Sequence, residues 1–96
     1  MLTNQSFKDW ALDQKRWKLS TINAYAKQLD KISKYLALSG LIQTKSIYLV
    51  APGDLNYIYN RWYKEPGIKD VDSKRNRLPS NSFKRYIEFS NDSQLK

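Results

Sequence analysis

Few types of side chain in this sequence could take part in catalysis or metal binding. Its 96 residues include neither histidine nor cysteine. Without histidine the chain lacks the commonest general base, the usual catalytic triads and most transition-metal sites. Without cysteine it has no disulfide and no thiolate metal site, which permits a reducing compartment, and we expect the cytoplasm. The remaining acids and bases indicate binding rather than catalysis.

Two aspartates and a lysine come nearest to a catalytic motif. Asp70 and Asp72 precede Lys74, which resembles the carboxylates and lysine of metal-dependent nucleases. In those enzymes the residues come from the core of a sheet, whereas here they lie in a segment of alternating charge. The three glycines are far apart, so there is no glycine-rich phosphate loop. We therefore expect no enzymatic activity, no metal and no cofactor.

Lysine and arginine are the groups that the chain has in excess. Seventeen of them stand against nine aspartate and glutamate residues, which gives a formal charge of +8. Such an excess favours polyanionic partners through long-range attraction and counterion release. The alternative is that these residues only keep the protein soluble. An anionic membrane surface is less favoured, because the predicted helices need their apolar faces for one another.

The basic residues fall into four groups along the sequence: Lys15, Arg16 and Lys18; Lys27, Lys31 and Lys34; Lys69, Lys74, Arg75 and Arg77; and Lys84 and Arg85. One surrounds Trp17 just before the longest predicted helix, whose positive dipole end and free N–H groups could hold a phosphate. Ser80, Asn81 and Ser82, which could contact phosphates or base edges, lie near the later groups. The predicted nucleic-acid-binding residues are Lys15, Arg16, Lys18, Lys69, Lys74, Arg75, Asn76, Arg77, Lys84 and Arg85. A secondary basic face is predicted at Lys27, Lys31 and Lys34.

Aromatic residues make up 14% of the chain, which is typical of a folded domain. Trp10 lies one heptad before Trp17, and we predict that Trp10 anchors the core while Trp17 packs over it. Tyr25, Tyr59 and Tyr86 fall on apolar helical stripes, which favours a structural use for them. We therefore assign no tyrosine as a platform for stacked bases.

The longest predicted helix runs from Ser20 to Gly40. Ser20 is a preferred N-cap residue, and Gly40 can take the left-handed conformation that ends a helix. The predicted buried stripe consists of Ile22, Tyr25, Ala26, Leu29, Ile32 and Leu36. The three lysines of the secondary basic face fall on the opposite side.

Three shorter helices are predicted around this one. They cover residues 6–15, capped by Ser6 with Asp9, then a segment from Pro52 to a stop at Pro66, and a last helix that Pro79 introduces. We expect an extended segment at 46–50, a polar basic loop at 68–78 and a frayed tail at 91–96. No segment approaches the roughly 18 apolar residues of a membrane span. The prediction is one all-α domain over residues 1–96, a compact four-helix orthogonal bundle with its core at about 6–89.

Three strings of this sequence are similar to a known kind of domain: STINAYAKQLDKISKYL, SIYLVAPGDLNYIY and NRLPSNSFKRYIEFSN. The matching positions are Thr21, Tyr25, Ile47, Tyr48, Asp54, Leu55, Asn76, Ser80 or Ser82, Phe83, Tyr86, Ile87 and Phe89. They resemble the helical N-terminal domain that precedes the nuclease domain in many bacterial restriction-type endonucleases. The arrangement is also similar to the SAM-like core-binding domain of tyrosine recombinases, which clamps duplex DNA. The resemblance covers about Ser6 to Phe89 and implies DNA contact without catalysis.

Two functions follow as expectations. The first is a non-catalytic domain that binds nucleic acid through phosphates, duplex DNA in preference to RNA, in a restriction-modification or phage-defence setting. The second is a small phage-type inhibitor or protein-interaction module that acts on a host nuclease or a CRISPR complex. Both a fragment of a larger endonuclease and a complete small protein are compatible with the sequence, and it fixes neither the oligomeric state nor a DNA sequence preference.

Overall fold

The computed structural model describes residues 2–94, and these residues form an all-α fold without a strand. The predicted class is therefore confirmed, but there are five α-helices where four were predicted. The helices are α1 (Asn4–Trp10), α2 (Leu19–Ser39), α3 (Leu55–Tyr63), α4 (Ile68–Lys74) and α5 (Leu78–Gln94). Shorter turns connect them, one π-helical at Ala11–Lys15 and two 3-10 at Ile47–Leu49 and Pro52–Asp54.

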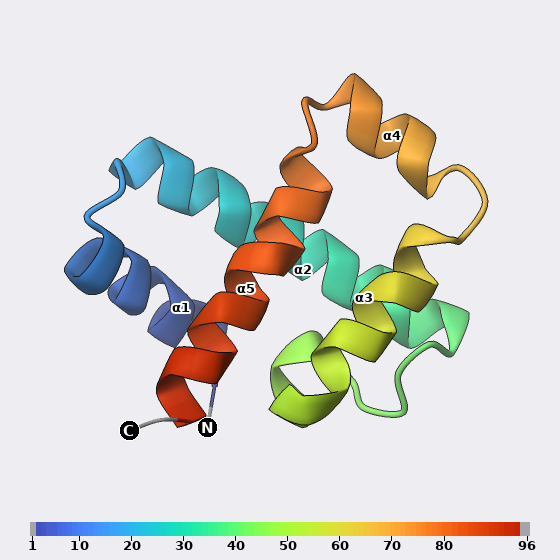
Figure 1. The fold of residues 1–96 in the computed structure, drawn as a ribbon, viewed down its shortest axis with the longest axis horizontal. Coiled ribbons are helices and arrows are strands. Elements are labelled where there is room, and N and C mark those ends of the chain that lie inside the picture. The colour runs from blue at the N-terminus through green and yellow to red at the C-terminus, as the bar shows by residue number, and fades with distance from the viewer. Residues whose placement is uncertain (1, 95–96) are drawn as a thin grey trace.

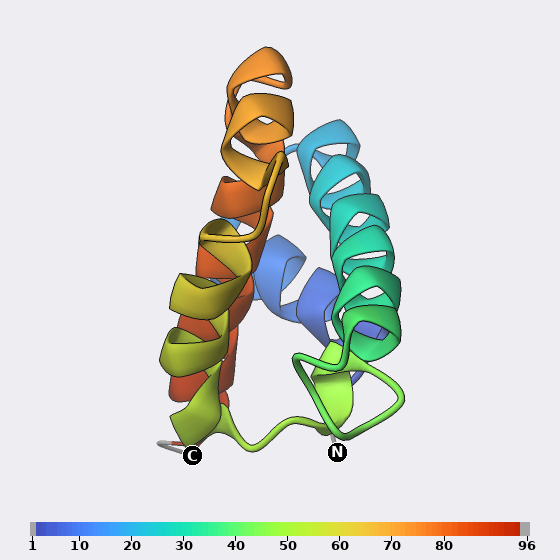
Figure 2. The ribbon, with the colours of Figure 1, turned by 90° about the vertical axis from the view of Figure 1, so that its right-hand side faces the viewer.

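The helices form two layers. In Figure 1, α5 crosses in front of α2, with α1 on one flank and α3 and α4 on the other. In the perpendicular view of Figure 2, α3, α4 and α5 lie on one side of the molecule and α2 lies on the other. The principal contact between the layers is that of α2 with α5. The core therefore lies between α2 and α5, and the outer side of each faces solvent.

The predicted stripe of α2 is the buried side of that helix. Ile22, Leu29 and Leu36 are fully buried, and Gly40 ends the helix at φ +80° as predicted. The predicted start at Ser20 is wrong, because the helix begins at Leu19 with Lys18 at the N-cap position. No side chain caps this end of α2.

The first helix also starts earlier than predicted. Thr3, and not Ser6, is the N-cap residue of α1, and the Thr3 N–H donates a hydrogen bond to Ser6 Oγ at 2.7 Å. This reciprocal capping box satisfies two backbone donors at once, whereas Asp9 instead accepts a hydrogen bond from Gln5. The π-helical turn that follows ends at Arg16, which has a left-handed backbone (φ +54°).

Residues 46–50 do not form the extended segment that was predicted. They form a 3-10 turn, and the buried Ile47 N–H donates to Ser33 Oγ at 2.9 Å. The Leu49 and Val50 N–H groups bond back within the same segment. A single extended segment with no strand beside it would leave these backbone groups unpaired in the interior, so the turn is favoured.

The basic segment 68–78 is mostly helix, and its prediction as a loop is wrong. Its residues 68–74 form α4, which starts after Gly67 (φ +84°). Asp72 is fully buried and accepts hydrogen bonds from the Ser80 N–H at 2.8 Å and the Tyr63 hydroxyl at 2.9 Å. The sequence hides this helix because a carboxylate, and not an apolar residue, occupies its buried position.

The C-terminal end of α5 corrects a further prediction. The helix extends through Asn91 to Gln94, where a frayed tail was predicted, and residues 95–96 lie outside the described part of the chain. Asp92 accepts a hydrogen bond from the Trp10 Nε1–H at 3.1 Å. This bond ties the last turn of α5 to α1.

Candidate nucleic-acid interface

Five basic side chains lie over aromatic rings; one of them, Arg61 over Tyr57, lies within α3, and the other four come from α5, from α4 and from the turn after α1. We call these four pairs the cation–aromatic face; it consists of Lys15 over Trp10, Arg85 over Trp17, Lys84 over Tyr59 and Lys69 over Tyr63. The distances from each charged group to its ring centroid run from 5.4 to 5.9 Å. Cations within about 6 Å of an aromatic ring are attracted by its quadrupole. None of these eight residues belongs to α2.

Two of these cations meet at one carboxylate. Glu88 Oε1 pairs with Lys15 Nζ at 2.5 Å, and its Oε2 pairs with Arg85 Nη1 at 3.2 Å. Both cations lower the pKa of Glu88, with the hydrogen bond from Lys15 as the largest cause. Beneath them, Trp10 and Trp17 pack edge to face with centroids 5.9 Å apart, as predicted for the core. The junction before α2 and the last helix are thus brought together, although they lie far apart in the sequence.

The other two cations lie over a pair of stacked tyrosines. The Tyr59 and Tyr63 rings are 5.8 Å apart with an interplanar angle of 16°, and Tyr59 packs on the buried Phe83 of α5. The hydrogen bond to Asp72 raises the pKa of Tyr63, while the positive charge of Arg77 opposes that rise.

The turn between α4 and α5 carries three more of the predicted residues, Arg75, Asn76 and Arg77. Asn76 and Arg77 both have left-handed backbones, with φ +54° and +61°. The Arg77 N–H donates to the Asp72 carbonyl at 2.7 Å, which closes the turn. Because Asp72 already accepts the Ser80 N–H, the first turn of α5 has fewer free donors for a phosphate than a bare helix start.

The secondary basic face of α2 is separate from these residues. Lys27, Lys31 and Lys34 are exposed on the side of α2 opposite to its buried stripe. Figure 2 shows α2 on the opposite side of the molecule from α5, and among the described residues none of these lysines lies over an aromatic ring. Lys31 and Arg75 instead line a shallow groove between α2 and α4.

The remaining predicted residues are exposed but not gathered at one place. Arg16 lies at the left-handed residue that ends the π-helical turn, and Lys18 occupies the N-cap position of α2. Lys74 pairs with Asp70 at 3.1 Å on the surface of α4. The structure thus divides the predicted binding residues among the cation–aromatic face, the α4–α5 turn and the α2 junction.

Sequence reasoning missed the residues that hold the cations in place. Composition and charge grouping do not single out Glu88, and the apolar stripe indicates only a core position for Tyr59. A signal is present in both cases, since Lys84 and Arg85 precede Glu88 by four and three residues, and Tyr59 precedes Tyr63 by four. Such spacings place side chains next to one another on a helix.

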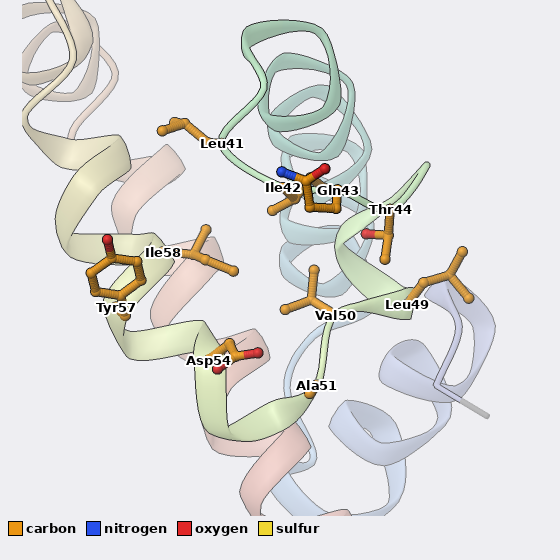
Figure 3. Close-up of a pocket in the computed structure, with 10 residues that line it drawn as sticks. All are labelled: Leu41, Ile42, Gln43, Thr44, Leu49, Val50, Ala51, Asp54, Tyr57 and Ile58. Atoms are coloured by element: carbon orange, nitrogen blue, oxygen red, sulfur yellow. The ribbon is translucent and has the colours of Figure 1, made fainter.

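A pocket of about 300 Å³ lies between the segment after α2 and the start of α3. Its lining residues, drawn in Figure 3, are Leu41, Ile42, Gln43, Thr44, Leu49, Val50, Ala51, Asp54, Tyr57 and Ile58. Asp54 is the one charged residue among them, and the side chains of Leu49 and Tyr57 are exposed. The pocket is therefore apolar, unlike the cation–aromatic face.

Comparison with known proteins gives no relative for this geometry. No protein-family model, no curated protein and no solved structure matches the chain. Within residues 2–94, no three acidic residues gather in a way that could hold a metal ion. None of the helices described is long and apolar enough to cross a membrane.

Proposed function

We propose that this domain binds nucleic acid without catalysing a reaction, and that it prefers duplex DNA to RNA and contacts its phosphates with the cation–aromatic face. The observation that carries this proposal is the set of four cations of the cation–aromatic face, each of which lies over an aromatic ring. Phosphates are the commonest targets of lysine and arginine in protein–DNA complexes.

Aromatic rings support phosphate binding by restricting the basic side chains. A free lysine or arginine loses rotamer freedom when it binds a phosphate, and this loss opposes association. Lys84 and Lys69 already lie over Tyr59 and Tyr63, with their charged groups 5.9 Å from the ring centroids. Part of that entropy is therefore lost on folding, which leaves less to lose on binding.

The dimensions of the molecule suit a duplex. Its two longer principal extents are 36 and 28 Å, and one turn of B-DNA measures about 34 to 36 Å. Contacts to phosphates fix the position of a protein on the duplex but do not distinguish one base sequence from another. We therefore propose binding with little sequence preference.

The test is the affinity for a generic DNA duplex at two salt concentrations. Several phosphate contacts make the affinity fall steeply as salt rises, with a slope in log–log form of about −0.9 per contact. A matched RNA duplex measures the preference for DNA. No detectable binding at low salt would contradict the proposal.

The resemblance of the three sequence strings supports the finer features of the proposal. On this basis we propose a SAM-like, orthogonal helical arrangement, a cytoplasmic location and a role in restriction-modification or phage defence. The absence of an enzymatic role is likewise proposed. Metal-dependent turnover that disappeared on changing Asp70 or Asp72 would contradict it.

The apolar pocket favours a second candidate, a protein-interaction module such as an inhibitor of a nuclease or CRISPR complex. Leu49 and Tyr57 at its edge are 49% and 63% exposed, and an exposed tyrosine beside an apolar pocket is suited to a protein partner. A pull-down from lysate treated with nuclease discriminates the two functions. A partner that is retained after the treatment and no longer captured by Tyr57→Ala supports the second candidate.

A further inference from the structure

The contacts of Glu88 carry an inference that rests on the proposed nucleic-acid binding. A carboxylate with both oxygens on basic groups has the charge and geometry of two non-bridging oxygens of a phosphate. Glu88 has this arrangement, with one oxygen on Lys15 and the other on Arg85. We propose that Lys15 and Arg85 form a phosphate subsite that the Glu88 carboxylate occupies in the free protein.

The two cations are positioned by more than Glu88. Lys15 Nζ lies 5.4 Å from the Trp10 ring centroid, and the Arg85 guanidinium lies 5.5 Å from that of Trp17. Trp10 is only 7% exposed and is fixed by its bond to Asp92. If the carboxylate moves away, the rings therefore still keep the two cations close together.

The subsite is open to a ligand. The side chains of Lys15, Arg85 and Glu88 are 33%, 49% and 32% exposed. A phosphate of a polyanion can therefore approach from solvent and replace Glu88, which stays attached to its own helix. In this exchange the Glu88 carboxylate and the external phosphate compete for the same two cations, Lys15 and Arg85.

The half of the cation–aromatic face that contains Lys84 and Lys69 differs from the Lys15–Arg85 half in its ion pairs. Within the described residues, neither Lys84 nor Lys69 forms an ion pair with a carboxylate. These two lysines can accept phosphates without displacing an internal anion. We infer that Glu88 weakens binding at the Lys15–Arg85 subsite specifically.

The first experiment compares Glu88→Gln with wild type and with Glu65→Gln. Glu65 lies outside the subsite, with a weak contact to Tyr35 at 3.4 Å, so this variant makes the same charge change elsewhere. We expect Glu88→Gln to bind a DNA duplex about tenfold more tightly at low salt, with a salt slope steeper by about one phosphate contact. Glu65→Gln should change affinity less than about twofold. An equal change in both variants, or weaker binding by Glu88→Gln, would overturn the proposal.

The second experiment uses inorganic phosphate and does not depend on DNA binding. The indole N–H signals of Trp10 and Trp17 are followed by NMR as phosphate is added to each variant. In Glu88→Gln these signals should shift and saturate, while in wild type they should shift several-fold less, and Trp62 on α3 serves as the internal control. No saturable shift in Glu88→Gln overturns the subsite, whereas absent DNA binding with a normal phosphate titration overturns only the proposed function.

A further pair of variants keeps the test valid if Glu88→Gln is unstable. In the wild-type background, Lys15→Gln should reduce duplex affinity less than Lys84→Gln, because Lys15 is already neutralised in part by Glu88. A larger reduction for Lys15→Gln would contradict the inference. Far-UV circular dichroism of each variant confirms that it is folded.

Discussion

The two basic surfaces of this protein differ in how their charges are held. On α2, Lys27, Lys31 and Lys34 repeat at helical spacing, are exposed and, among the described residues, form no ion pair and lie over no aromatic ring. In the cation–aromatic face, each of the four cations lies over a ring, and two of them share the carboxylate of Glu88. A helical repeat of lysines is thus the more visible pattern in a sequence, whereas the more organised cations come from separate segments.

The largest effect is expected when the same number of positive charges is removed from each of the two surfaces in turn. We expect Lys69→Gln, Lys84→Gln and Arg85→Gln together to lower duplex affinity about a hundredfold at low salt, with a salt slope shallower by about 0.9 for each phosphate that is no longer bound. The corresponding triple variant at Lys27, Lys31 and Lys34 should lower affinity only a few-fold, through long-range attraction alone. Fluorescence anisotropy of a labelled duplex at several salt concentrations measures both. Equal reductions in affinity would show that the aromatic rings under the cations make no difference.

A second prediction concerns Asp72, whose hydrogen bond with the Ser80 N–H joins α4 to the start of α5. Asp72→Ala removes the acceptor of the buried Ser80 N–H and should lower the free energy of unfolding by about 2 kcal/mol. Asp70→Ala, two positions earlier, removes only an exposed pair with Lys74 and should cost less than about 0.5 kcal/mol. Thermal unfolding of both variants provides the measurement. Similar melting temperatures would mean that Asp72 does not fix the start of α5.

A third prediction tests the end of α2, which depends on a local signal. Gly40 has φ +80° and no atom within 4 Å of an added Cβ, so Gly40→Ala introduces backbone strain but no clash. We expect the free energy of unfolding to fall by about 1 kcal/mol, measured by urea denaturation. Gly53→Ala, at a position that also has open space and no positive φ, is the matched control and should be close to neutral.

The smallest expected effect is the pH dependence of the Glu88 contacts. Lys15 and Arg85 lower the pKa of Glu88 below its ordinary value of 4.5, so the folded state holds the ionised form more strongly than the unfolded state does. Wild type should therefore be more stable than Glu88→Gln at pH 7 by about 0.5 kcal/mol, because the pair is largely solvated. This difference should disappear as the pH falls from 4.5 through the lowered pKa. A difference that persists at a pH low enough to protonate Glu88 in both the folded and the unfolded state would exclude the ion pairs as its cause.

The sequence alone determined the features whose signals are local. The apolar stripe of α2, its end at Gly40 and the packing of Trp17 on Trp10 all follow from spacing and side-chain type, and the structure confirms them. The predicted number of helices was wrong because α4 has a buried carboxylate, Asp72, at the position where a core residue was expected. A buried acid is stable only when its hydrogen-bond donors are supplied, and here they come from Tyr63 and the Ser80 N–H.

Only the tertiary structure decided which basic residues lie next to one another. The sequence shows a basic junction before α2 and a basic pair on the last helix, but nothing local says that Lys15 and Arg85 meet at Glu88. Their meeting depends on the packing of α1 against α5, where Phe7 and Trp10 both contact Phe89. Periodicity reports which side of one helix is buried, whereas contact between two helices depends on how they cross. The composition therefore determined the kind of partner that we propose, and the fold determined the surface that we propose to bind it.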